Sequence, residues 1–199
     1  MYPTRRFVDA DNSCLFSSIG YLLEKNEYDI NTKYRYRQLL VQFLENYPNI
    51  EDILDCPKND YIDKIINPNS WGGAIELKLF SEMFQVEIAS IDTLSNRIDI
   101  FGQDCNYTNR IFIIYNGIHY DPLVMATTEN HQDDITIFDV DDDNITISFQ
   151  NYCKTFKENG DYIDTSIFKL LKCNDCDLVF ENQDDATTHA INYDHWSFL

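Results

Sequence analysis

A change of hydrophobic pattern near residue 85 divides the chain into a helical part and a strand-rich part. Before this point apolar residues recur at helical spacing, and after it β-branched and aromatic residues form short runs between polar turns. Asn31 and the pair Gly72-Gly73 are start signals for two of the helices. We predict helices at 14–25, 32–47, 59–67, 73–84 and 145–158, and strands at 85–91, 96–101 and 110–115. This order predicts an α/β (α+β) fold in which helices pack on a central sheet.

The composition indicates a globular chain with an acidic surface. Its 199 residues are 44% hydrophobic, which suffices for one packed domain of moderate size, alone or with a small satellite. The sequence has no apolar leader and no apolar run of membrane length, so we expect a cytoplasmic protein, with the nucleus as an alternative location. The formal charge of −19, from 34 acidic and 15 basic residues, opposes binding to nucleic acid and to anionic membranes.

The six cysteines do not suggest a disulfide framework. Cys56, Cys105 and Cys153 are scattered singly, whereas Cys14 follows helix-start residues and the pair Cys173/Cys176 has the spacing of metal ligands. This pattern fits a reducing compartment.

Cys14 lies at the predicted start of the first helix. Asp11, Asn12 and Ser13 favour helix N-termini, and the residues after Cys14 have the pattern of an amphipathic helix. The helix macrodipole favours a thiolate at this position, and free backbone N–H groups could hold a developing oxyanion. Cys14 is therefore either a nucleophile or a packing residue at the start of a core helix.

His119 follows a strand-like run and the turn signal Asn116-Gly117. An imidazole at the end of a strand can face a cleft, and Asp121 lies on the same face if the chain is extended. We expect Asp121 to accept the Nδ1 proton, which leaves Nε2 for a thiol. The alternative is a turn histidine bonded to nearby backbone.

The C-terminal motif Cys173-x2-Cys176-x12-His189-x5-His195 has the spacing of a Cys₂His₂ zinc finger. Two thiolates on a β-turn and two imidazoles from one helical face would form a closed tetrahedral site, and Phe180 would fill the small core. We expect a structural Zn²⁺; the alternative is unrelated Cys and His at matching spacing. Residues 173–199 carry no Lys or Arg to neutralise phosphates, so we expect the finger to bind protein or to be structural.

Three motifs together resemble those of one known family. They are Asp11-Asn12-Ser13-Cys14-Leu15-Phe16, Trp71-Gly72-Gly73-Ala74-Ile75-Glu76 and Gly117-Ile118-His119-Tyr120-Asp121. They are similar to motifs of the OTU (ovarian tumour) deubiquitinases, and the resemblance spans nearly the whole chain. It implies a papain-like cysteine protease fold in which Cys14 attacks an isopeptide carbonyl and His119 is the base. We assign the orienting role to Asp121 and keep Asp11 as support of the catalytic site.

The resemblance also implies a channel for the C-terminal tail of ubiquitin. Its walls would be formed by residues 8–14, 91–109 and 115–119. We expect Asn12, Ser13 and Ile118 to contact the substrate. A narrow channel suits the terminal Gly-Gly of ubiquitin because glycine has no side chain. Ubiquitin and polyubiquitin chains are the expected partners, and a ubiquitin-binding module with a degenerate site is the alternative to an enzyme.

With its finger, the chain is similar to the OTU branch that works with the valosin-containing AAA ATPase in endoplasmic-reticulum-associated degradation. This similarity implies a place in the unfolded protein response. Related members dock the ATPase through a ubiquitin-like N-terminal domain, and this chain starts too close to Cys14 to include one. We divide the chain into an OTU catalytic domain at 1–125, an acidic loop and linker helix at 126–170, and a zinc finger at 171–199. Residues 162–171 are expected to be extended.

Overall fold

The computed structural model describes residues 1–24, 27–48, 50, 53–54, 56–128, 130–159, 171–180, 188–189, 192–193 and 195. The chain separates into two compact units, Met1–Tyr162 and Ile163–Leu199. The first unit contains a large sheet with its helices, and the second contains a two-stranded hairpin.

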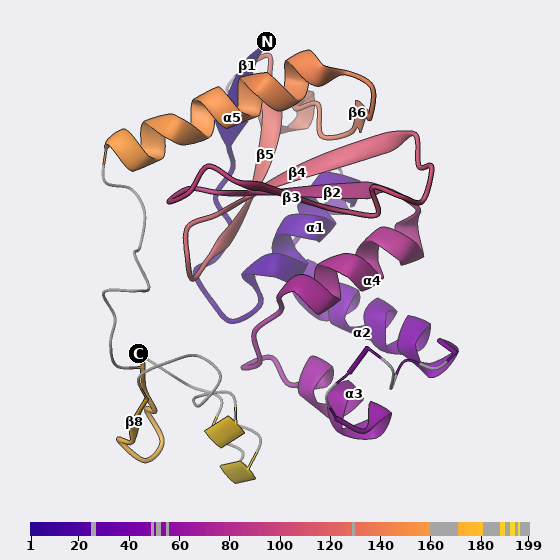
Figure 1. The fold of residues 1–199 in the computed structure, drawn as a ribbon, viewed down its shortest axis with the longest axis vertical. Coiled ribbons are helices and arrows are strands. Elements are labelled where there is room, and N and C mark those ends of the chain that lie inside the picture. Colours follow the sequence, from indigo (N-terminus) through magenta and orange to yellow (C-terminus); the bar gives the residue numbers. More distant parts are fainter. Residues whose placement is uncertain are drawn as a thin grey trace. The chain divides into compact units, whose positions relative to one another are not determined.

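A mixed sheet forms the centre of the first unit (Figure 1). Its strands are β1 (Tyr2–Arg5), β2 (Glu87–Asp92), β3 (Ile98–Phe101), β4 (Asn109–Tyr115), β5 (Tyr120–Ala126) and β6 (Phe138–Asp139). Their order is β1-β5-β4-β2-β3, and β6 pairs with the start of β4. Strands β2 and β4 are parallel, whereas the other pairs are antiparallel. Tyr115 pairs with Tyr120, so residues 116–119 form the turn between β4 and β5.

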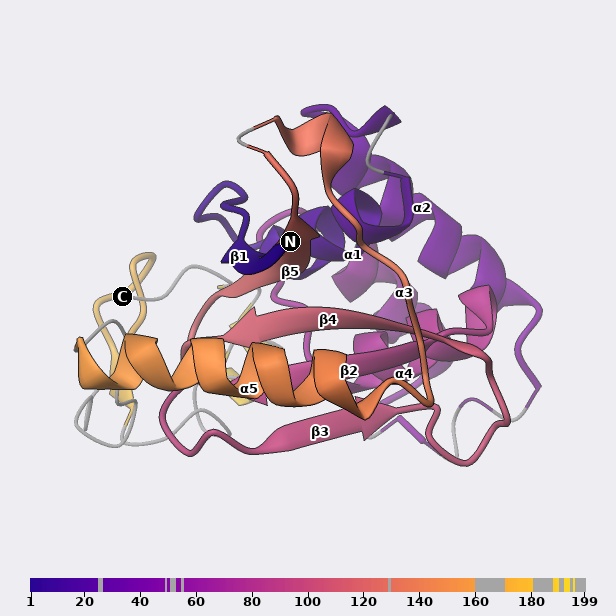
Figure 2. The same cartoon turned by 90° about the horizontal axis from the view of Figure 1, so that it is seen from above.

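Helices cover both faces of this sheet. On one side lie α1 (Cys14–Glu24), α2 (Thr32–Glu45), α3 (Lys58–Ile66) and α4 (Ala74–Phe84). On the other side lies α5 (Asp143–Glu158), which Figure 2 shows running along β4, β2 and β3. A short 3-10 helix, His131–Asp133, precedes β6. No helix in the described part of the chain is both long and apolar enough to span a bilayer.

Neighbouring residues of the central strands enter two different cores, because successive side chains of a strand point to opposite faces. On β4, Ile111 and Ile113 pack with α1, α2 and α4, whereas Phe112 and Ile114 pack on the side of α5. The fully buried ring of Phe149 in α5 lies 4.7 Å from that of Phe112, centroid to centroid. Full burial of a large apolar side chain contributes about 1.5–3 kcal/mol, which fixes α5 on the sheet.

The predicted fold class is confirmed, and each predicted helix and strand is present with its ends shifted by two residues or fewer. Gly73 opens α4 as expected, and its N–H donates to the Glu76 carboxylate at 2.6 Å. Asn31 precedes α2, although its side chain makes no capping hydrogen bond.

The structure adds the strands β1, β5 and β6, which the sequence pattern does not predict. In β5, Asp121-Pro122 is typical of a turn, and proline removes one donor from the strand ladder. The helix expected in a linker at 126–170 instead packs on the sheet, so the compact unit continues to Tyr162. The extended segment predicted at 162–171 lies outside the described residues except for Leu171.

Candidate active site

Cys14 is the first residue of α1 and is 7% exposed. The loop before it is closed by its own hydrogen bonds: Ser13 N–H donates to the Asp11 carboxylate at 2.8 Å, and Cys14 N–H donates to the Asp11 carbonyl at 3.2 Å. The predicted position of Cys14 at a helix start is therefore confirmed. The expectation of free N–H groups is not met at Ser13 and Cys14, because the loop folds back so that Asp11 accepts from both.

The turn between β4 and β5 presents His119. The Asn116 side-chain oxygen accepts the N–H groups of Ile118 at 3.2 Å and His119 at 2.9 Å. Gly117 has φ of +104°, a conformation that favours glycine, so the Asn116-Gly117 turn signal has a structural cause. These constraints fix the backbone from which the imidazole projects.

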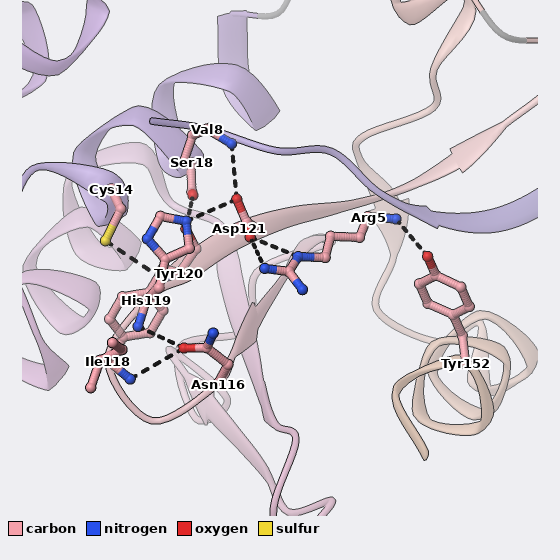
Figure 3. Close-up of polar contacts among 10 residues, drawn as sticks. All are labelled: Arg5, Val8, Cys14, Ser18, Asn116, Ile118, His119, Tyr120, Asp121 and Tyr152. Atoms are coloured by element: carbon pink, nitrogen blue, oxygen red, sulfur yellow. Dashed lines mark hydrogen bonds and ion pairs between the residues drawn. The ribbon is translucent and has the colours of Figure 1, made fainter. Parts of the chain in front are cut away.

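Cys14, His119 and Asp121 form one continuous group (Figure 3). His119 Nε2 lies 3.1 Å from Asp121 Oδ1, and Figure 3 shows the Cys14 sulfur on the Nδ1 side of the imidazole, where it helps to raise the pKa of His119. The N–H of Tyr120 donates to Cys14 Sγ at 3.5 Å. The prediction that Asp121 accepts the Nδ1 proton is wrong. Because the turn directs Nε2 toward β5, Nδ1 is the nitrogen left for the thiol.

The environment of His119 favours its protonated form. Burial lowers the pKa of the imidazole, but the hydrogen bond to Asp121 and the interaction with the nearby Cys14 side chain outweigh this effect and raise that pKa to about 9. An imidazolium between a sulfur and a carboxylate can stabilise a thiolate and can later donate its proton to a leaving group.

Asp121 is a fully buried carboxylate, and three groups bind it. Oδ1 accepts the N–H of Val8 at 2.9 Å in addition to His119, and Oδ2 accepts Arg5 Nε at 2.7 Å. Sequence reasoning missed Arg5 and Val8, since both lie on or after a strand that it did not predict. The carboxylate is held in one orientation before any substrate arrives.

Asp11 supports the nucleophile loop and does not contact His119 in the described hydrogen-bond network. Its second oxygen accepts Lys33 Nζ at 2.6 Å, and this hydrogen bond raises the pKa of Lys33. The structure therefore gives Asp11 a part in shaping the loop and leaves the contact with the imidazole to Asp121.

Arg37 is a second residue that sequence reasoning missed. Its side chain comes from α2, is 2% exposed and stacks on the Phe16 ring, 4.0 Å from the centroid. It donates to the Ser13 hydroxyl at 2.9 Å and to the carbonyls of Asn12 at 3.1 Å, Ile65 at 2.8 Å and Ser70 at 2.6 Å. Burial lowers the pKa of Arg37 to about 10, so it remains charged at neutral pH. A single guanidinium thus connects the nucleophile loop to the segment before α4.

The residues predicted to contact substrate have different exposures. Ile118 is 44% exposed beside the base, and Asn12 accepts a hydrogen bond from the indole N–H of Trp71, itself 36% exposed. The Ser13 side chain is buried, and its hydroxyl is bound by Arg37. Ile118 and Asn12 thus remain accessible to a ligand, whereas Ser13 can offer little more than its backbone.

The second unit brings the predicted metal ligands together. Ligand atoms of Cys173, Cys176, His189 and His195 all lie within 4.8 Å of one another. The strands β7 (Leu171–Lys172) and β8 (Val179–Phe180) form a hairpin that carries both cysteines in its turn. The Phe180 ring lies 4.7 Å from that of His189, as expected for a small core. His195 lies outside the helical residues, so the two imidazoles do not come from one helical face as predicted.

A thiol at a helix start, an imidazole and a buried carboxylate on a mixed sheet define the class of cysteine proteases. Residues 9–131 match the family described as OTU-like cysteine protease, and the chain belongs to this family.

The chain is similar over nearly its whole length to three relatives of known name. It is 37% identical to ubiquitin thioesterase OTU1 of Dictyostelium discoideum, covering 99% of the chain and 61% of the relative. It is 35% identical to ubiquitin thioesterase OTU1 of Homo sapiens, covering 98% of the chain and 56% of the relative. It is 35% identical to the ovarian tumor domain-containing deubiquitinating enzyme 2 of Arabidopsis thaliana, covering 98% of the chain and 95% of the relative. The chain thus spans about three fifths of the length of the first two.

Solved structures agree with this assignment. An ovarian tumor (OTU) domain solved in complex with ubiquitin superposes with a TM-score of 0.68 at 30% identity, covering 81% of this chain and 90% of that one. The Hazara virus OTU, at 22% identity and a TM-score of 0.51, shares the fold and covers 64% of this chain and 84% of that one.

Proposed function

We propose that the protein is a thiol-dependent deubiquitinase that hydrolyses the isopeptide bond at the C-terminal glycine of ubiquitin. The observation that carries the proposal is the alignment of Cys14, His119 and Asp121, in which His119 Nε2 lies 3.1 Å from Asp121 Oδ1 and the thiol lies on the other side of the imidazole (Figure 3). Similarity to ubiquitin thioesterases and to an OTU domain in complex with ubiquitin supports the choice of substrate.

The proposed reaction has two stages. The Cys14 thiolate attacks the carbonyl carbon of the terminal glycine, and the imidazolium of His119 gives its proton to the departing lysine amine. This leaves an acyl-enzyme thioester. His119 then takes a proton from a water whose oxygen attacks the thioester; this releases the ubiquitin carboxyl group and restores the Cys14 thiolate beside the imidazolium.

The N-terminus of α1 supports the developing oxyanion. The positive end of the helix lies at Cys14, and its N–H makes only a 3.2 Å hydrogen bond to Asp11. An oxyanion is a stronger acceptor than a neutral carbonyl and can take over this donor in the transition state. Arg37 holds the Asn12 carbonyl and thereby keeps the loop in register with the helix.

We also propose that the four-residue cluster of the second unit holds a structural Zn²⁺. Two thiolates and two imidazoles are the donor set that zinc prefers, and Cys176 Sγ and His195 Nδ1 lie 3.3 and 3.2 Å from His189 Nε2. Four donors would leave no open position, so the proposed role of the ion is to fold the finger and not to take part in hydrolysis.

The proposal extends to the cell biology that the sequence motifs imply. Resemblance of the OTU motifs and the finger supports a cytoplasmic role in endoplasmic-reticulum-associated degradation, with the valosin-containing AAA ATPase as a partner if an N-terminal docking domain exists outside this chain. Co-sedimentation of the full-length gene product with that ATPase tests the partnership, and a complete absence of binding would remove it.

Cleavage of a panel of di-ubiquitins tests the enzymatic proposal. Wild-type protein should cleave at least one linkage, and Cys14→Ala, with the same circular dichroism spectrum, should cleave none. Cys56→Ala is a matched control because Cys56 is a thiol just before α3, outside the segments expected to line the channel, and it should cleave as wild type does. A folded wild-type protein that binds ubiquitin and leaves every linkage intact would make it a ubiquitin-binding module.

A further inference from the structure

We propose that Arg5 is a positioning residue for catalysis, which acts by fixing the Asp121 carboxylate against His119. The inference rests on the proposed function, because it assigns a new residue to the same site. Arg5 precedes the segment 9–131 that matches the family.

The contacts of the carboxylate give Arg5 a specific task. Arg5 directs Nε and Nη2 at one oxygen, Oδ2, at 2.7 and 2.6 Å. The other oxygen, Oδ1, is thereby turned toward His119 Nε2 and the N–H of Val8. Figure 3 shows Asp121 lying between the imidazole and the guanidinium. Such charge-assisted bonds are short and directional, so the fork sets the rotation of the carboxylate as well as its charge.

Arg5 is itself held by α5, which also lies outside residues 9–131. Its backbone N–H donates to the Tyr152 hydroxyl at 3.1 Å. Its guanidinium lies 4.7 Å from the ring centroid of Phe7 and 5.5 Å from that of Phe156. The side chain is 13% exposed, so little water competes for its donors. Helix α5, which the sequence predicts to be part of a linker, therefore holds Arg5, and Arg5 in turn holds the Asp121 carboxylate that orients His119.

The next residue supplies a matched control. Arg6 makes an equally close ion pair with a buried carboxylate, Asp134, at 2.8 and 2.7 Å. The side-chain exposures of the two arginines are 13% and 10%, and both carboxylates are fully buried. Asp134 also accepts a hydrogen bond from the Tyr21 hydroxyl, whereas Asp121 accepts from the imidazole. The two pairs thus have the same chemistry, and one of them adjoins the base.

The test compares Arg5→Met with Arg6→Met on ubiquitin carrying a C-terminal fluorogenic amide, with folding checked by near-UV circular dichroism. We expect Arg5→Met to lower kcat by about tenfold to a hundredfold, since a small misplacement of a catalytic group costs this much, while KM stays within about twofold. Arg6→Met should lower the urea midpoint comparably and leave kcat within about twofold. An equal loss of kcat in both variants would overturn the proposal.

A double-mutant cycle asks whether Arg5 acts through Asp121. In an Asp121→Ala background, Arg5→Met should change kcat by less than about twofold, because the group it positions is gone. The same tenfold loss in that background would overturn the proposal. If Arg5→Met does not fold, Arg5→Lys decides. It keeps the charge but cannot form the fork, so kcat should fall about threefold or more, and a kcat equal to wild type would count against the role.

Alkylation of Cys14 by iodoacetamide at pH 6.5 separates this inference from the proposed function, because it needs no ubiquitin. Arg5→Met should alkylate Cys14 about tenfold more slowly than wild type, since a displaced carboxylate no longer secures the imidazolium beside the thiol, and Arg6→Met should not differ. If wild type does not cleave ubiquitin substrates but still alkylates faster than Arg5→Met, only the proposed substrate is refuted. Equal alkylation of wild type and Arg5→Met would refute the role of Arg5.

Discussion

Replacement of Arg37 by methionine should destabilise the first unit strongly. The side chain is 2% exposed and donates to the carbonyls of Asn12, Ile65 and Ser70 and to the Ser13 hydroxyl. Methionine has a similar length but no donor, so these three carbonyls would lose a charged partner. Each buried polar group left unsatisfied costs about 1–3 kcal/mol, and relief from burying a charge offsets part of the sum. We expect a loss of about 3–5 kcal/mol in the free energy of unfolding.

Urea unfolding followed by circular dichroism measures this loss. With an m-value of about 2 kcal/mol/M, the midpoint should fall by roughly 2 M. Arg97→Met is the matched control, because that side chain is 71% exposed in a surface ion pair with Asp99, and it should change stability by no more than about 0.5 kcal/mol. Arg37→Lys should show a loss in the free energy of unfolding between those of Arg37→Met and Arg97→Met, since one ammonium cannot hydrogen-bond all four of these acceptors. A loss below about 1 kcal/mol for Arg37→Met would show that the guanidinium does not hold these loops together.

Three further predictions concern the base, the sheet and the finger. The pH profile of kcat/KM should have an alkaline limb near pH 9, where His119 loses its proton. Because the pKa of His119 is higher in the folded protein than its usual value, the contribution of His119 to stability is complete below about pH 6.5 and is lost as the pH rises through about 9. Urea midpoints measured at about pH 6 and about pH 10 would reveal this loss. Phe149→Ala should cost about 3–5 kcal/mol in urea unfolding, because the fully buried ring fixes α5 on the sheet, and an unchanged midpoint would contradict this packing. Purified protein should contain about one equivalent of zinc by mass spectrometry, Cys173→Ser should lose it, and a metal-free wild type with a folded C-terminal unit would remove the zinc proposal.

The parts of the site that could be predicted from the sequence are those with local signals. Cys14 follows three helix-start residues, and His119 follows a turn whose Gly117 has positive φ, so both lie on the elements that the sequence predicts. The approach of the two side chains could be inferred only through family resemblance. Their contact depends on the packing of α1 against β5, which spacing alone does not determine.

What could not be predicted depends on pairing between distant segments. Strand β1 has only four residues and forms by pairing with β5. Arg5 and Asp121 are 116 residues apart in the sequence, so no local pattern predicts their ion pair. The choice of Nε2 for Asp121 depends on the rotation of one ring at a turn. Arg37 lies in a polar stretch of α2 that resembles a solvated helix face, and its burial follows from the loops that fold over it.

The assignment of Cys14 as the nucleophile of a ubiquitin-directed hydrolase can be tested in a single labelling experiment. The protein is reacted with ubiquitin whose C-terminus carries an electrophile, and the product is identified by intact-mass and peptide mass spectrometry. We predict one ubiquitin per chain, attached at Cys14, with labelling abolished in Cys14→Ala and strongly slowed in His119→Ala. Attachment at another cysteine, or undiminished labelling of Cys14→Ala, would contradict the assignment.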